Sequence, residues 1–152
     1  MAVIGLLHVA VGVGDMERAL VFYRDLIGLR VTLDAEESVF GGRDPDRNRR
    51  RAVYLRTEDG PHAFFIVLDQ PLGREPFGAP PRLLQLGTHH FSFWVENLRA
   101  MYERIVAAGF RTIVPPTEAD AAAYGELAGS GRVLTTIVKD QDGNPVQLDQ
   151  RL

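Results

Sequence analysis

The chain has 152 residues, of which 45% are hydrophobic and 24% charged, with a net charge of −3 and no cysteine. This length allows one domain or two half-sized modules, and the composition is that of a globular protein rather than a disordered one. The absence of cysteine excludes disulfides, thiolate nucleophiles and Cys-type zinc sites, and the negative charge offers no global attraction for nucleic acid.

No apolar run approaches the roughly 18 residues that a membrane span needs. The first residues also lack a basic region followed by a signal-type apolar stretch. We therefore expect a cytoplasmic protein that binds neither nucleic acid nor membranes.

One basic run, Arg47 and Arg49-Arg50-Arg51, stands among glycine, proline, aspartate and asparagine residues. This composition predicts a solvated, charged loop between strands rather than a phosphate-binding patch.

The first half of the chain reads as a strand, a helix and three further strands. Residues 7–13 are apolar and largely β-branched, which predicts a strand. Asp15 is expected to cap a helix whose apolar residues recur at helical spacing until Gly28. Strands are then expected at residues 29–33, 52–57 and 62–69.

The second half repeats this order. His8 and His90 occupy corresponding positions, and so do Asp15 and Asn97. Residues 66–70 likewise match residues 146–150. The expected elements are a strand at 89–95, a helix capped by Asn97 and ended by Gly109, strands at 110–114, 133–139 and 145–150, and an Asp142-Gly143 hairpin turn.

The repeat predicts an α+β fold of two βαβββ modules whose mixed sheets form a cleft. The first module is expected at 1–70 and the second at 88–152, joined by a connector at 71–87 that contains four prolines. Residues 115–131 are rich in proline, alanine and glycine, which indicates either a mobile flap with a short helix around 118–124 or an inert surface loop.

Strand alternation assigns side chains to the cleft. His90, Ser92 and Trp94 share one face of their strand, opposite the apolar Phe91 and Phe93. By the same parity His8, Phe65, Gln147 and Asp149 face the cleft.

If the two modules pair around a pseudo-two-fold axis, His8 and His90 approach one point, where Gln147 supplies an oxygen donor. Two imidazoles and an oxygen form a plausible divalent-metal site. His89 and His62 are expected to have no function.

These motifs resemble those of the vicinal oxygen chelate superfamily, which includes glyoxalase I, extradiol dioxygenases and bleomycin resistance proteins. The resemblance covers almost the whole chain. The segments that carry it are Leu7-His8-Val9-Ala10-Val11, Phe22-Tyr23 with Gly28-Leu29, His90-Phe91-Ser92-Phe93-Trp94-Val95, and Asp140-Gln141-Asp142-Gly143-Asn144-Pro145-Val146-Gln147-Leu148. It implies a glyoxalase/bleomycin resistance-like fold and a small-molecule ligand.

The resemblance also implies where a metal would bind. In members of the superfamily that bind a metal, the ligands come from the first, fourth, fifth and eighth strands. The corresponding residues of this chain are His8, Val67, His90 and Gln147. Val67 has no donor atom, which excludes the four-ligand arrangement of glyoxalase I. Gln147 stands where the superfamily usually has glutamate, and a neutral amide cannot abstract a proton.

Two classes of function follow. The first is a metal-dependent enzyme, an isomerase, epimerase or dioxygenase, with iron, nickel, cobalt, manganese or zinc held by His8, His90 and Gln147. Asp149 or Asp69 could then replace the missing base. The alternative is a metal-independent protein that sequesters a drug or metabolite against Phe65, Ser92 and Trp94. No organic cofactor is indicated, and the resemblance implies a homodimer.

Overall fold

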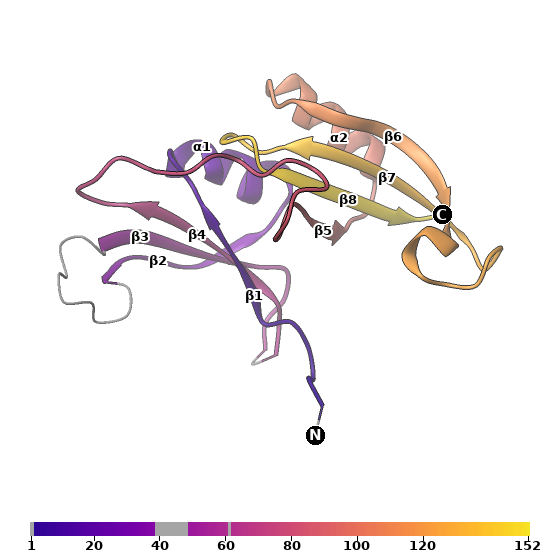
Figure 1. Cartoon of the computed structure of the whole chain (residues 1–152), viewed down its shortest axis with the longest axis horizontal. Helices are drawn as coiled ribbons and strands as arrows, with labels where there is room; N and C mark the ends of the chain where they lie inside the picture. The colour runs from indigo at the N-terminus through magenta and orange to yellow at the C-terminus, as the bar shows by residue number, and fades with distance from the viewer. Residues whose placement is uncertain (1, 39–48, 61) are drawn as a thin grey trace. The chain divides into compact units, whose positions relative to one another are not determined.

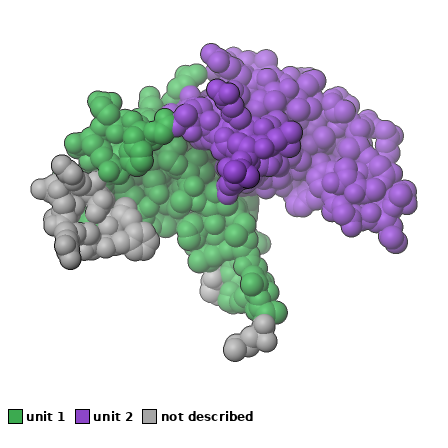
Figure 2. Space-filling view, viewed as in Figure 1, with its two compact units in different colours: residues 1–78 green, residues 79–152 purple. Residues whose placement is uncertain are grey.

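The chain forms two compact units, Met1–Gly78 and Ala79–Leu152, which are coloured separately in Figure 2. The computed structural model describes residues 2–38, 49–60 and 62–152. Each unit contains one four-stranded mixed sheet with a helical segment after its first strand (Figure 1). The predicted α+β fold of two modules is therefore confirmed. Within the described ranges no helix combines the length and the apolar character that crossing a membrane requires.

The first unit contains four strands and one helical segment. They are β1 (His8–Gly12), α1 (Met16–Leu20), η1 (Val21–Leu26), β2 (Arg30–Ser38), β3 (Arg49–Arg56) and β4 (Phe65–Pro71). The sheet order is β1-β4-β3-β2, in which β1 runs parallel to β4 and the other neighbours are antiparallel. The first strand of the unit therefore pairs with its last.

The helical segment of the first unit begins and ends as the sequence predicts. The Asp15 carboxylate accepts a hydrogen bond from the backbone N–H of Arg18 at 3.1 Å, which caps the helix. Gly28 follows the segment with a φ of 93°, a conformation that favours glycine. The segment and the sheet share an apolar core that includes Val11, Ala19, Leu20, Phe22, Val53, Leu55, Ile66 and Leu68.

The strand β3 is longer than predicted because it contains part of the basic run. Residues 49–51 pair in register with residues 36–38 of β2, which are largely acidic. The three guanidinium groups form ion pairs with Glu36, Glu37, Asp69, Asp34 and Glu17. The loop prediction is therefore wrong for these three arginines, because acidic partners distant in sequence neutralise them within a sheet. Arg47 lies outside the described residues.

The second unit has the same arrangement with one additional segment. Its elements are β5 (Phe91–Trp94), α2 (Leu98–Ala107), β6 (Thr112–Asp120), η3 (Ala121–Tyr124), β7 (Arg132–Lys139) and β8 (Pro145–Arg151). The sheet order is β5-β8-β7-β6, again with its first and last strands parallel. The predicted hairpin turn is confirmed, since Gly143 has a φ of 95° and the Asp140 carboxylate accepts from the N–H groups of Asp142 and Asn144.

The start of α2 differs from the prediction. Asn97 has a φ of 53° and its side chain makes no capping hydrogen bond. The backbone N–H of Leu98 instead donates to Oε1 of Gln150 at 2.7 Å. A side chain of β8 thus satisfies a free N–H at the helix N-terminus, a role that the prediction gave to the neighbouring asparagine.

The segment at 115–131 is more regular than expected. Residues 115–120 continue β6, an edge strand in which two prolines are accommodated by irregular register. The Asp120 carboxylate then accepts from the N–H of Ala122 at 2.9 Å, and the N–H of Ala121 donates to the carbonyl of Gly131 at 2.9 Å. These bonds hold η3 at the end of the β6–β7 hairpin and set the position of Tyr124.

Candidate functional site

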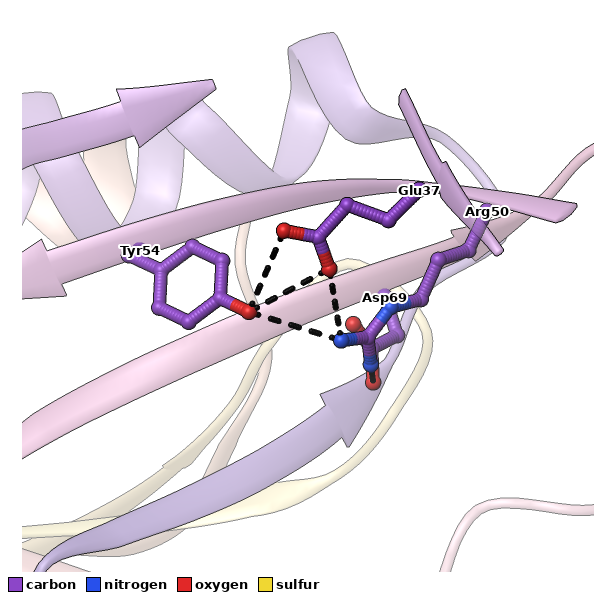
Figure 3. Close-up of polar contacts among 4 residues, drawn as sticks. All are labelled: Glu37, Arg50, Tyr54 and Asp69. Atoms are coloured by element: carbon purple, nitrogen blue, oxygen red, sulfur yellow. Dashed lines mark hydrogen bonds and ion pairs between the residues drawn. The ribbon is translucent and has the colours of Figure 1, made fainter. Parts of the chain in front are cut away.

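In the first unit, a polar cluster joins β2, β3 and β4 (Figure 3). The Arg50 guanidinium donates to Glu37 at 2.9 Å and to Asp69 at 2.6 Å. The Tyr54 hydroxyl lies 3.3 Å from the nearer Glu37 oxygen. Two carboxylates therefore share one guanidinium. Burial raises the pKa of Asp69, although the positive charge of Arg50 opposes this effect.

Beside this cluster the same face is covered with aromatic rings. His8 stacks on Phe65 with ring centroids 4.9 Å apart, and Tyr54 lies 5.6 Å from Phe65. The Arg56 guanidinium carbon is 4.4 Å from the Phe65 ring centroid. Phe65 is only 8% exposed, so these neighbours cover most of the ring that was predicted to contact a ligand.

In the second unit, Asp149 lies at the centre of a hydrogen-bond cluster built from β5, η3 and β8. It is 2% exposed. One carboxylate oxygen accepts from the Tyr124 hydroxyl at 2.6 Å, and the other accepts from the Ser92 hydroxyl. Gln147 Nε2 donates to both oxygens, at 3.0 and 3.1 Å. A buried carboxylate needs such donors, and here three side chains supply them.

The Tyr124 hydroxyl is held in its protonated, donating form. Burial raises the pKa of Tyr124, and the hydrogen bond to the Asp149 carboxylate raises it further. Both effects disfavour a tyrosinate anion next to an existing negative charge. Tyr124 therefore acts as a hydrogen-bond donor that attaches η3 to β8.

Trp94 lies on the same sheet face and is 57% exposed. It is paired in register with Asp149, so the two side chains project from the same side of the sheet. The Tyr124 ring centroid lies 5.8 Å from that of Trp94, and the Arg151 guanidinium carbon lies 5.1 Å from the Trp94 ring centroid. Arg151 also forms an ion pair with Glu126. The result is an exposed aromatic surface next to a buried carboxylate. We call the surface formed by Ser92, Trp94, Tyr124, Gln147 and Asp149 the Trp94 face.

The two neighbouring histidines contact each other, contrary to the expectation that His89 faces away from His90. Their Nδ1 atoms lie 2.7 Å apart, so one ring donates and the other accepts. Alternation fails here because β5 begins only at Phe91. Burial and the adjacent His89 lower the pKa of His90, which favours its neutral form near pH 7.

The fold and the matched motifs together define a family. The family model for the Glyoxalase/Bleomycin resistance protein/Dioxygenase superfamily matches residues 5–148, and the chain belongs to this superfamily. No curated protein matches the chain.

Solved structures share the fold. A glyoxalase family protein from Bacillus cereus superimposes with a TM-score of 0.78 at 16% identity, over 100% of this chain and 97% of the other. A glyoxalase family protein from Enterococcus faecalis gives 0.63 at 20% identity, over 96% of this chain and 97% of the other. The trypanothione-dependent glyoxalase I of Leishmania major gives 0.63 at 17% identity, over 93% and 83% of the two chains.

The donor atoms at the positions implied for a metal do not make a complete site. His8 and His90 each supply an imidazole, and Val67 has no donor atom. The amide nitrogen of Gln147 donates hydrogen bonds to Asp149. The carboxylate of Asp149 is itself occupied by three side-chain donors. Within the described part of either unit, no three His, Cys, Asp or Glu side chains could together hold a metal ion. Neither the four-ligand centre nor the set of two histidines and a carboxylate is present at these positions.

The structure thus brings some predicted residues together and adds others. Ser92, Gln147 and Asp149 meet in one cluster with Trp94 beside them, whereas Asp69 is paired with Arg50 and Phe65 with His8. The sequence interpretation did not include Tyr124, Arg151, Arg50 or Tyr54 in the site. Each unit is described by itself, so the approach of His8 to His90, the cleft and the homodimer stay predictions.

Proposed function

We propose that the chain binds a small organic molecule with a planar ring, which stacks on Trp94, and that this binding needs no metal. The observation that carries the proposal is the position of Trp94. A large aromatic side chain exposed on a sheet face loses contact with water when a flat ligand covers it, and this loss favours binding. The buried Asp149 cluster beside it supplies the polar groups that orient a ligand.

The structure of the Trp94 face supports this role over a purely structural one. Tyr124 and Arg151 flank the Trp94 ring without burying it. The hydrogen bonds to Asp149 hold Tyr124 in position before any ligand arrives. Preorganised side chains lose less conformational freedom on binding, which increases affinity.

Trp94 is the only tryptophan in the chain, so its fluorescence reports directly on this face. We expect planar aromatic compounds, from single rings to fused bicyclic ones, to quench Trp94 fluorescence in a saturable manner, with the same affinity in the presence of a chelator. Isothermal titration calorimetry provides the independent measurement. Trp94→Ala should weaken binding about tenfold, the equivalent of about 1.4 kcal/mol.

Phe77→Ala is the matched control, because Phe77 is also an exposed aromatic residue (81%) but lies in the stretch between β4 and β5, outside any strand or helix. It should bind with unchanged affinity. The proposal is wrong if no planar compound binds, or if Phe77→Ala and Trp94→Ala weaken binding equally.

A second candidate function is the metal-dependent one. Burial and the adjacent His89 lower the pKa of His90, and a metal binds only the neutral imidazole. Here His8 and His90 would hold a divalent ion, with Gln147 Oε1 or water completing its ligands. The ion would polarise oxygen atoms of the substrate. Asp149 or Asp69 would supply the carboxylate for proton transfer.

Metal analysis separates the two candidates. Protein purified without a chelator should be tested for bound metal, and added iron, nickel, cobalt and manganese should be tested for a thermal shift. A stoichiometric metal that is lost in the His8→Ala, His90→Ala double variant supports the second candidate. Ligand binding that persists in this double variant supports the first.

A further inference from the structure

The edges of the two sheets are not equally protected against pairing with another chain. In the described part of the molecule the edge strands are β1 and β2 in the first unit and β5 and β6 in the second. An edge strand has unpaired N–H and C=O groups along one side, to which a strand of another molecule can bond. Charged residues, prolines, bulges or a short length normally prevent this pairing.

Three of these strands carry such protection. β2 contains four charged residues, one arginine and three acidic residues. β6 contains two consecutive prolines, two acidic residues and an irregular register. β5 is only four residues long. Each of these features makes pairing with a strand of another molecule unfavourable.

The remaining strand, β1, follows an exposed apolar stretch. Residues 2–7 run from the N-terminal end of the chain directly into β1 (Figure 1). Val3, Ile4, Leu6 and Leu7 in this stretch are each more than half exposed. The backbone carbonyl of Leu7 accepts a hydrogen bond from the N–H of Phe65 at 3.1 Å, so the pairing with β4 starts just before β1. We call residues 2–12 the β1 edge segment.

The β1 edge segment also lacks charged residues. No Asp, Glu, Lys or Arg occurs before Asp15, and the only titratable side chain in the segment is that of His8. The segment contains no proline, and its register with β4 is regular. None of the features that protect the other three edges is therefore present here.

The absence of charge suits pairing of the segment with itself. When two identical strands pair antiparallel about a two-fold axis, every residue faces a residue of the same segment. A net charge in the segment would therefore repel its own copy, as the net acidic β2 and β6 would. The β1 edge segment avoids this repulsion, and its exposed apolar side chains lose contact with water in both copies.

We propose that the β1 edge segment pairs antiparallel with the same segment of a second copy of this chain, which joins the two first-unit sheets into one. Leu7, at the midpoint of the segment, then faces its own copy, and Ile4 faces Ala10. Association stops at a dimer, because the opposite edge of each sheet is the charged β2. This interface does not depend on the ligand of the Trp94 face.

Sedimentation equilibrium of the full chain measures the dissociation constant of the dimer. Ile4→Lys lies outside β1 and introduces one charge per copy into the interface. It should leave the circular dichroism spectrum unchanged and raise the dissociation constant by about tenfold or more. Leu127→Lys is the matched control, because Leu127 is about as exposed as Ile4 but lies outside any strand or helix. A chain that stays monomeric, or equal effects of the two substitutions, would overturn the proposal.

A second substitution tests the register. In the proposed pairing, a glutamate introduced by Ala10→Glu faces the lysine introduced by Ile4→Lys in the other copy, and opposite charges on facing residues attract. Ala10→Glu alone should weaken the dimer. The double variant should recover most of the affinity that Ile4→Lys loses. A double variant that is weaker than either single variant would overturn the pairing.

Disulfide trapping locates the two-fold axis. The chain has no cysteine, so a single introduced cysteine can be oxidised only to its own copy. Cysteine is introduced separately at Val3, Ile4, Leu6, Leu7 and Val9, and the yield of linked dimer is measured after mild oxidation. The yield should peak at Leu7 and fall towards Val3, because only residues near the axis come within disulfide reach. A dimer that links equally at every position, or at none, has its interface elsewhere and contradicts the proposal.

Discussion

Two aspartates at corresponding positions of the two sheets, Asp69 and Asp149, are stabilised by different chemistry. Asp69 is paired with the charged guanidinium of Arg50, whereas Asp149 accepts hydrogen bonds from neutral hydroxyl and amide groups. The Arg50 guanidinium is shared by two carboxylates, Glu37 and Asp69, so this cluster and the Asp149 cluster each keep one net negative charge. The two aspartates therefore differ in the kind of group that stabilises them, despite the internal repeat.

At the residue scale, Asp149→Asn should destabilise the protein by about 2 kcal/mol, since an amide –NH₂ placed among three donors leaves at least one buried group unsatisfied. Urea unfolding measures the loss. Glu103→Gln, an exposed substitution on α2, is the control and should change stability by less than about 0.5 kcal/mol. A loss for Asp149→Asn no larger than for this control would mean that the cluster contributes nothing to stability.

The titration of Asp69 gives a second prediction at this scale. Burial raises its pKa above the ordinary value of an aspartate, whereas the hydrogen-bonded ion pair with Arg24 lowers the pKa of Asp25. Carboxyl ¹³C shifts measured against pH should place the two midpoints on opposite sides of that ordinary value, which is about 3.9. A group whose pKa is raised by folding stabilises most at low pH, so its contribution should be lost as pH rises from about 4 through the folded pKa. Equal midpoints would contradict the prediction.

At the element scale, β2 and β3 are joined by cross-strand ion pairs of unequal burial. Arg50 has a side chain that is 20% exposed and bridges two carboxylates, whereas Arg49 is 50% exposed and contacts only Glu36 among the pairs described. Surface pairs contribute little because solvent screens them, and more buried pairs leave an uncompensated charge when one partner is removed. The two arginines therefore form a matched comparison.

Arg50→Ala should destabilise the protein by about 2 kcal/mol, because Glu37 and Asp69 then repel each other without a shared cation. Arg49→Ala should cost less than about 1 kcal/mol and should depend more strongly on salt. Denaturant unfolding at low and high ionic strength measures both. Equal effects of the two substitutions would show that burial does not control the strength of these pairs.

Strands of both sheets show what sequence patterns can and cannot predict. Alternation along β5 and β8 was sufficient to put Ser92 and Asp149 on one face, because a strand has a simple period. The extent of β3 could not be predicted, since glycine, proline and asparagine before Arg49 suggest a loop and its acidic partners are far away in sequence. Tyr124 was missed for a similar reason, because its contact with Asp149 depends on how β6 and η3 end.

At the scale of the whole molecule, the two units each have a sheet, a helical segment and a core, and a stretch without strand or helix lies between their sheets. Between Gly73 and Thr88 the chain forms no strand or helix. Arg74 and Arg82 are exposed there, whereas Arg50 and Arg51 lie within β3. Exposed backbone outside regular structure is the preferred substrate of proteases.

Limited digestion with trypsin should therefore cut first after Arg74 or Arg82 and release two fragments that correspond to the units. Mass spectrometry of early time points identifies the bonds cut. Arg104, within α2, serves as an internal control and should be cut late. Early cleavage within β3 or α2 would contradict the arrangement of the chain.

The parallel pairing of the first and last strands of each unit has a consequence for how the protein is made. β1 finds its neighbour only when β4 has been synthesised, and β5 must wait for β8 in the same way. Such contacts between distant residues slow folding, because a long loop must close before the contact forms. On the ribosome, we expect the first sheet to close once Pro71 has left the exit tunnel, before most of the second sheet has been translated.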